Sequence, residues 1–111
     1  MAGDPEALVE RVAVCGGAGD SLLAAARAAG VDAYVTADLR HHPASEAREL
    51  GPATALVEVS HWASEWPWLH GAAERVAAAL AEEGLQVTTA VSTHRTDPWS
   101  FHVPSPAGTV R

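Results

Sequence analysis

The chain has 111 residues and a formal net charge of −7, from 7 Lys and Arg against 14 Asp and Glu. This length allows one domain with a modest core. The acidic balance leaves no patch for neutralising phosphates, which argues against nucleic-acid binding and against an anionic membrane surface. No apolar run approaches the roughly 20 residues of a membrane span, and the polar start carries no signal region. The single cysteine, Cys15, fits a reducing cytoplasm.

Strand and helix patterns alternate through the first half of the chain. A β-branched run closed by glycines predicts a buried strand, and the helix formers after it predict a helix with Asp20 or Ser21 as N-cap and Gly30 as its stop. The same alternation then continues with shorter elements. The expected elements are a strand over 11–17, a helix over 18–30, a strand over 32–39, a helix over 43–51 and a strand over 54–61.

The longest helix is predicted over 64–84, with Ser64 as its N-cap, Pro67 in its first turn and Gly84 at its end. One face of this helix is apolar at helical spacing and is expected to pack on the sheet. The residues of that face are Leu69, Ala72, Val76 and Leu80. A fourth strand is expected over 85–92, followed by an extended tail.

This alternation predicts an α/β fold with a mostly parallel sheet of about four strands and helices packed on it. Ligands of such sheets bind at the carboxyl ends of the strands. Three polar clusters follow predicted strands, namely "GGAGDS", "TADLRHH" and "SHWASE".

The glycine cluster after the first strand allows two interpretations. Its backbone N–H groups could receive an anion at a helix N-terminus, or the glycines could serve a tight turn that needs positive φ. The spacing matches neither the dinucleotide fingerprint nor the P-loop. Both interpretations, a nucleotide-binding loop and a structural turn, stay open.

The second cluster offers Asp38, His41 and His42. Aspartate and histidine are suitable ligands for a first-row divalent ion. The alternative is a solvated loop in which Asp38 caps the following turn.

The third cluster places His61 at the end of a strand and Glu65 at the start of a helix, so both side chains can converge on one point. Imidazole and carboxylate together suit zinc, iron, manganese or cobalt. A carboxylate stabilised by the helix dipole and a partly buried histidine are the alternatives. Since a bound metal normally takes three or more protein ligands, the missing ones must come from elsewhere. The nearby tryptophans suit core packing, a subunit interface or the wall of a substrate pocket; they are Trp62, Trp66 and Trp68.

Four segments resemble, in order and spacing, the carboxy-terminal part of the Nif-three-like dinuclear metal-centre proteins, often labelled GTP cyclohydrolase 1 type 2 homologues. The segments are "RVAVCGGAGDSLL", "DAYVTADLRHH", "VEVSHWASEWPWL" and "TDPW". The resemblance covers most of the chain and is strongest to actinobacterial members. It implies one lobe of a two-lobed α/β fold, over residues 1–99, with an irregular tail over 100–111.

The resemblance also implies a homohexamer with two divalent metal ions in each complete subunit. His61 and Glu65 match the family's carboxy-terminal His-x-x-x-Glu ligands. Asp38 and His42 match a Gly-Asp-x-x-x-His segment near the cleft, where we expect them to support the ligands or to contact substrate. The remaining ligands would come from an amino-terminal lobe, and hydrolase activity on a small molecule is expected only when that lobe is present.

Departures from the family pattern accompany the resemblance. Ala37 and Ser60 stand where many members have glycine, and the His-His-Pro at 41–43 has the flanks of the carboxy-terminal lobe. Met1 falls where a full-length member would be in mid-chain, so we expect a truncated product, an excised domain or half of a split protein. The alternative function is a non-catalytic metal-binding or oligomer-assembly module.

Overall fold

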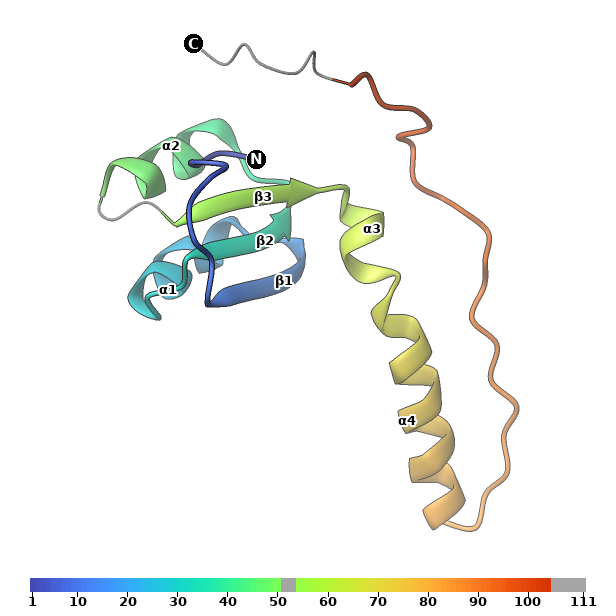
Figure 1. Ribbon diagram of the computed structural model, residues 1–111. Helices are drawn as coiled ribbons and strands as arrows, with labels where there is room; N and C mark the ends of the chain where they lie inside the picture. Colours follow the sequence, from blue (N-terminus) through green and yellow to red (C-terminus); the bar gives the residue numbers. More distant parts are fainter. Residues whose placement is uncertain (51–53, 105–111) are drawn as a thin grey trace.

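A three-stranded parallel sheet forms the centre of the molecule (Figure 1). The computed structural model describes residues 1–50 and 54–104. The strands lie in the order β1-β2-β3 and are β1 (Val12–Ala18), β2 (Ala33–Ala37) and β3 (Ala55–Val59). The predicted α/β class with a parallel sheet is therefore confirmed, with three strands in place of about four.

The first two connections are helical and cover one face of the sheet. They are η1 (Asp20–Leu22) with α1 (Leu23–Ala28), and α2 (His41–Glu49). Tyr34 and Leu56 are register partners on β2 and β3, and they pack with Leu23 and Ala26 of α1 in one buried cluster. Alanines of α2 complete this small core.

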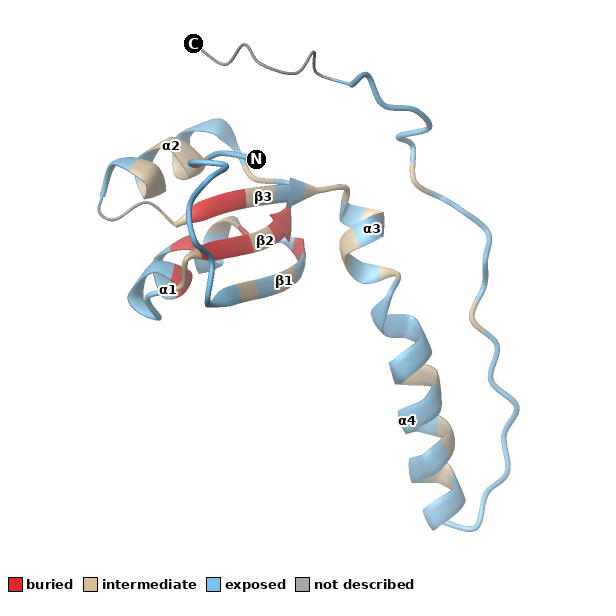
Figure 2. Ribbon diagram, in the orientation of Figure 1, coloured by how far each residue is buried: buried red, intermediate tan, exposed pale blue. Residues whose placement is uncertain are grey.

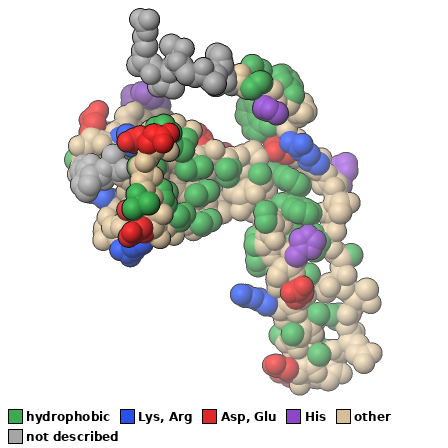
Figure 3. Space-filling model, in the orientation of Figure 1, with side chains coloured by type: hydrophobic (Ala, Val, Ile, Leu, Met, Phe, Trp, Pro, Cys, Tyr) green, Lys and Arg blue, Asp and Glu red, His purple; other side chains and the backbone are tan. Residues whose placement is uncertain are grey.

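The opposite face of the sheet is open (Figure 2). Val14, Val35 and Val57 are aligned across the three strands, yet Val14 is 74% exposed and its neighbour Val12 is 52% exposed. Figure 3 shows hydrophobic side chains gathered over the strands. Parallel sheets are normally covered on both faces, so this face has the composition of a surface that packs against another layer.

After β3 the chain forms two helices in place of the single helix that was predicted. They are α3 (His61–Glu65) and α4 (Trp68–Glu82), separated at Trp66 and Pro67. The predicted N-cap at Ser64 was wrong, because the helix begins earlier: the hydroxyl of Ser60 accepts the N–H of Ala63 at 3.2 Å.

The prediction that α4 packs on the sheet was also wrong. No residue of α4 is buried, and the helix projects away from the strands (Figure 1). Its apolar spacing is real, but the described part of the chain supplies no apolar surface opposite it. The molecule is accordingly elongated, with principal extents of 58, 34 and 25 Å.

The fourth strand expected over 85–92 does not form. This segment has no regular secondary structure and runs beside α4, far from either edge of the sheet (Figure 1). A strand needs a hydrogen-bonding neighbour, which local alternation cannot supply. At the β3 edge, Ala2 pairs with Leu56 in an antiparallel bridge.

Two of the predicted helix stops are confirmed. Gly30 (φ +63°) and Gly84 (φ +76°) follow α1 and α4 in the left-handed conformation that favours glycine. The stop predicted at Gly51 lies outside the described residues. In the part of the chain that the structure describes, no helix has the length and apolar character needed to cross a bilayer.

Candidate metal centre

His61 and Glu65 meet at the carboxyl end of the sheet. His61 is the first residue of α3, directly after β3, and Glu65 is the last, so one helical turn places both on the same face. The imidazole Nε2 lies 3.3 Å from Oε2 of Glu65, and both side chains are about half exposed, at 47% and 51%. The convergence expected from the sequence is therefore present, in a position open to a ligand or a second protein surface.

Asp38 contacts the other nitrogen of the His61 ring. It follows β2, and its Oδ2 lies 2.6 Å from Nδ1 of His61. An ionised carboxylate can only accept hydrogen bonds, so Nδ1 carries the hydrogen and Nε2 is the nitrogen that faces Glu65. The hydrogen bond that His61 donates to Asp38 is the main cause that raises the pKa of His61 above its ordinary value; desolvation opposes it, and the charges of Glu65 and Asp38 add to it.

Gly17 forms the floor beneath the His61–Glu65 pair. Its backbone has φ +73° at an irregularity of β1, and a Cβ there would lie 2.7 Å from Oε1 of Glu65 and 3.3 Å from Nε2 of His61. The N–H of Gly17 donates to Ser64 Oγ at 2.8 Å, and that hydroxyl donates to the carbonyl of His61 at 2.7 Å. Only a residue without a side chain leaves the Glu65 carboxylate and the His61 imidazole in these positions above β1.

The glycine cluster is packed into the fold and is not arranged as an anion cradle. Besides the amide of Gly17, the amide of Gly19 is used, donating to Ala37 O at 3.1 Å. Thr36 Oγ1 and Tyr34 Oη donate to the carbonyls of Gly17 and Gly19. These contacts favour the interpretation as a structural turn over a nucleotide-binding loop.

Asp20 does not cap the helix that follows it. No side chain caps η1 or α1; the Asp20 carboxylate instead accepts the backbone N–H of Arg40 at 3.1 Å and its Nε at 2.5 Å. A charged partner and a second amide satisfy this carboxylate better than one helix N–H. The loop after Asp38 is thereby tied to the loop after β1.

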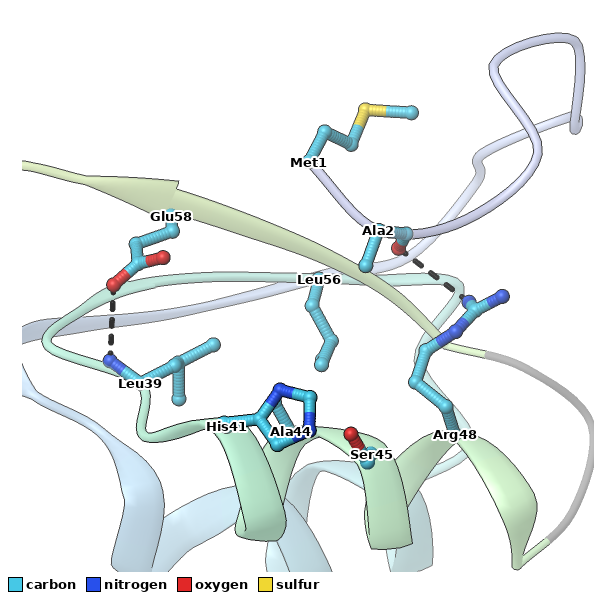
Figure 4. A pocket seen from close by; sticks show the side chains of 9 residues that line it. All are labelled: Met1, Ala2, Leu39, His41, Ala44, Ser45, Arg48, Leu56 and Glu58. Atoms are coloured by element: carbon cyan, nitrogen blue, oxygen red, sulfur yellow. Dashed lines mark hydrogen bonds between the residues drawn. The ribbon is translucent and has the colours of Figure 1, made fainter. Parts of the chain in front are cut away.

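His41 and His42 lie apart from the His61–Glu65 pair. Both are in the first turn of α2, with ring centroids 5.3 Å apart. His41 lines an open pocket between α2, β3 and the start of the chain (Figure 4), where the carboxylate of Glu58 accepts the N–H of Leu39 at 3.1 Å. No hydrogen bond or ion pair among the described residues joins His42 to His61 or Glu65.

The described residues bring together two candidate ligands at this site, His61 and Glu65. Within residues 1–50 and 54–104, no group of three or more His, Cys, Asp or Glu side chains is arranged to hold a metal ion. Asp38 is close, but it binds the ring nitrogen that points away from Glu65. The imidazole and carboxylate fit a first-row divalent cation in kind and fall short in number.

Asp97 is the residue at this site that the pattern analysis did not single out. Its carboxylate accepts the hydroxyl of Ser60 at 2.8 Å and the N–H of Trp99 at 3.0 Å, and its side chain is 4% exposed. The bond from Ser60 is the main cause that lowers the pKa of Asp97. Its position in the Asp-Pro-Trp motif was the available signal, but nothing local indicates that the tail returns to the start of α3.

Two of the tryptophans hold the same returning segment. Trp62 and Trp66 stack with ring centroids 5.5 Å apart, and Trp66 Nε1 donates to the carbonyl of Ser92 at 3.0 Å. Trp68, by contrast, is 64% exposed. Trp66 thus ties α3 to the tail, and neither Trp62 nor Trp66 belongs to the buried core. A subunit interface or a pocket wall stays a prediction for these rings.

A family comparison assigns this chain to a known group. The family model of Duf34/NIF3 (NGG1p interacting factor 3) matches residues 1–98. The chain belongs to this family. The resemblance noted in the sequence is thus confirmed at the level of the family.

Actinobacterial proteins are among the most similar relatives. A "GTP cyclohydrolase 1 type 2 homolog" of Streptomyces coelicolor is 53% identical over 105 residues, which is 95% of this chain and 36% of that protein. A protein of the same name from Mycobacterium tuberculosis is 57% identical over 100 residues, covering 90% and 25%. The chain thus spans about a third or less of the length of these relatives.

Solved structures show the same partial match. A Bacillus cereus protein related to NIF3 superposes with a TM-score of 0.71 at 32% identity, over 85% of this chain and 25% of that one. The Staphylococcus aureus protein SA1388 gives a TM-score of 0.71 at 28% identity. The Duf34/NIF3 fold described here corresponds to one part of a larger architecture.

Proposed function

We propose that this chain contributes His61 and Glu65 to a two-metal centre whose other ligands come from an amino-terminal lobe of the Duf34/NIF3 architecture. The observation that carries the proposal is the 3.3 Å approach of Nε2 to a carboxylate oxygen. Zinc, iron, manganese and cobalt all accept this pair of donors.

The tautomer of His61 explains how a metal ion would fit between Nε2 and Glu65. Because Asp38 accepts a hydrogen bond from Nδ1–H, a neutral His61 has a lone pair on Nε2. This lone pair faces the carboxylate of Glu65, whose oxygens also carry lone pairs. Two acceptors in contact repel unless a proton or a cation lies between them. A divalent metal ion satisfies both atoms and uses the open side of the pair for further ligands.

The chemistry proposed for the complete centre is hydrolysis. Two bound divalent ions would lower the pKa of a shared water molecule enough to make it a nucleophile at neutral pH. The part played by this chain is to present Nε2 and the Glu65 carboxylate at a fixed separation, on a helix anchored through Ser60 and Ser64. With two ligands alone, the chain is expected to have negligible catalytic activity.

Metal titration tests this proposal. Equilibrium dialysis of the 111-residue chain against Zn²⁺ or Co²⁺ should show weak binding of at most one ion per chain. His61→Ala and Glu65→Gln should each abolish it, whereas His102→Ala, in the exposed tail, should not. Binding that survives both substitutions, or metal-dependent turnover by the isolated chain, would contradict the proposal.

A non-catalytic assembly module is the second candidate, favoured by the exposed valines of the open sheet face. In this version the chain forms a homo-oligomer, a hexamer by the family resemblance, and carries less than one metal ion per chain. Metal content measured on the oligomer distinguishes the two candidates, since a complete catalytic centre requires two ions per subunit.

A further inference from the structure

We propose that Asp38 is a positioning residue that fixes His61 in the Nδ1–H form and so keeps Nε2 free as a ligand. This inference deepens the proposed metal function and rests on it for its purpose. The geometry that supports the inference is present in the chain without any metal.

The two carboxylates around His61 compete for its single neutral-state hydrogen. Asp38 Oδ2 lies 2.6 Å from Nδ1, and Glu65 Oε2 lies 3.3 Å from Nε2. The first distance is that of a short charge-assisted hydrogen bond, and the second is at the long limit of one. The hydrogen of the neutral ring therefore lies on Nδ1, where it is donated to Asp38, and the lone pair of Nε2 faces Glu65. A carboxylate on the far nitrogen of a metal-binding histidine is a recurrent means of setting the tautomer.

The backbone of Asp38 shows that this contact is enforced. It has φ +52°, and it is the non-glycine residue with positive φ in the described chain. Aspartate tolerates this conformation better than most residues, but such backbones persist only when their surroundings hold them. Here Glu58 accepts the N–H of the next residue, Leu39, and Asp20 accepts both the N–H and the Nε of Arg40. Two further carboxylates thus clamp the loop that delivers Asp38 to His61.

The clamp also gives Asp20 and Glu58 a function that their positions alone do not suggest. Neither touches His61, yet each fixes one of the two residues after Asp38. Glu58 lies on β3, and Asp20 opens η1 directly after β1, so the two anchors lie on either side of β2. The orientation of the imidazole is thereby fixed relative to the sheet. A ligand side chain supported by regular elements of the fold keeps its geometry better than one on a free loop.

The tautomer of His61 can be read directly in the metal-free protein. Long-range ¹H–¹⁵N spectra of the histidine-labelled chain, at a pH above the titration of the ring, should show Nδ1 protonated and Nε2 bare. The signal is assigned by its loss in His61→Gln. A wild-type ring with its hydrogen on Nε2 would overturn the inference, whether or not any variant folds.

Substitution of Asp38 tests whether its carboxylate sets the tautomer of His61. In Asp38→Asn the amide oxygen is a weaker acceptor than the Glu65 carboxylate, so the hydrogen should move to Nε2. The same exchange of an acid for its amide beside a catalytic histidine leaves geometry intact and gives the wrong tautomer. Glu46→Gln, an acid on α2 away from His61, should leave the spectrum unchanged. An Asp38→Asn ring that keeps the Nδ1–H form would overturn the inference.

Zn²⁺ titration of the same samples separates this inference from the metal proposal. The wild-type Nε2 signal should shift with Zn²⁺, and Asp38→Asn should bind Zn²⁺ about 10–100-fold more weakly. If Zn²⁺ leaves the wild-type Nε2 unaffected while Asp38→Asn still switches the tautomer, the metal proposal fails and the positioning role of Asp38 stands.

Discussion

The positions of the Glu65 carboxylate and the His61 imidazole above β1 depend on Gly17. Its left-handed backbone and its missing Cβ are both required, because the site carboxylate and imidazole lie directly above it. At Gly30 a positive φ is needed without such crowding, because the nearest atom to an added Cβ is 3.6 Å away. A substitution at Gly30 therefore tests backbone strain alone, whereas one at Gly17 tests backbone strain together with a steric clash.

Gly17→Ala should destabilise the chain more than Gly30→Ala does. Both substitutions carry about 1–2 kcal/mol of left-handed strain, and the alanine at 17 must in addition push Glu65 away. Urea unfolding of the two variants measures the difference. Equal losses of stability would mean that α3 shifts freely off β1.

Asp32 provides a pH-dependent contribution away from the site. Its carboxylate accepts the N–H of Arg11 at 2.7 Å and that of Glu10 at 2.9 Å, and these bonds, led by that of Arg11, lower its pKa. A carboxyl whose folded pKa is lowered stabilises the fold above its unfolded pKa of about 3.9 and loses that contribution as pH falls through the folded value.

Asp32→Asn should therefore be less stable than the wild type at neutral pH, with a difference that shrinks below about pH 4. Urea unfolding measured from pH 7 down to pH 3 checks this. A difference that stays constant across the range would show that the carboxylate charge has no part in holding the chain before β1.

At the scale of elements, the short strands and their exits were predictable from sequence because they depend on local signals. β2 and β3 are apolar runs with polar ends, and the left-handed glycines after α1 and α4 mark real helix stops. The class of the sheet followed from the alternation itself. The site was predictable to the same degree: residues at a strand end and at i+4 on the next helix must lie close together.

The elements that were mispredicted depend on distant parts of the chain. Within residues 1–50 and 54–104, the segment 85–92 alternates like a strand but has no strand beside it to pair with, and the apolar face of α4 is not packed on the sheet. The role of Asp97 likewise depends on a contact across 37 residues of sequence, with Ser60. Local periodicity shows what a segment can bury, but it does not show whether a partner is present.

Ser60 joins two elements through one hydroxyl, which caps α3 and donates to Asp97. Ser60→Ala should lower stability by about 0.5–2 kcal/mol from the lost cap, and it should release the tail. Thermal unfolding measures the first effect, and faster amide exchange at Trp99 reports the second. Ser45→Ala, on the pocket side of α2 and without a hydrogen bond to the tail among the described residues, serves as the control. Unchanged exchange at Trp99 in Ser60→Ala would show that other contacts hold the tail.

At the scale of the whole molecule, the protein has one covered sheet face and one open one. Among the described residues, the open sheet face and α4 expose apolar side chains, and the chain spans about a third or less of the length of its relatives. Apolar surface of this kind drives association in water despite the charge of −7.

We expect the 111-residue chain to self-associate, and Val14→Thr to weaken that association by reducing apolar area while keeping a β-branched residue in the strand. Light scattering coupled to size-exclusion chromatography at several concentrations measures the mass. Val103→Thr, an equally exposed valine in the tail, is the matched control. A monodisperse wild-type monomer at all concentrations would contradict this expectation.

The hydrogen bond between Asp97 and Ser60 closes a loop that leaves the sheet, runs out along α4 and comes back to the point of departure. A force applied to the C-terminus therefore reaches the sheet through this bond without first stretching α4. Because Ser60 directly precedes His61, a pulling force from a tether or surface attachment at that end would act on His61 before it stretches α4. Attachment at the N-terminus would instead act on the Ala2 bridge at the β3 edge, which is separate from the Ser60–Asp97 bond.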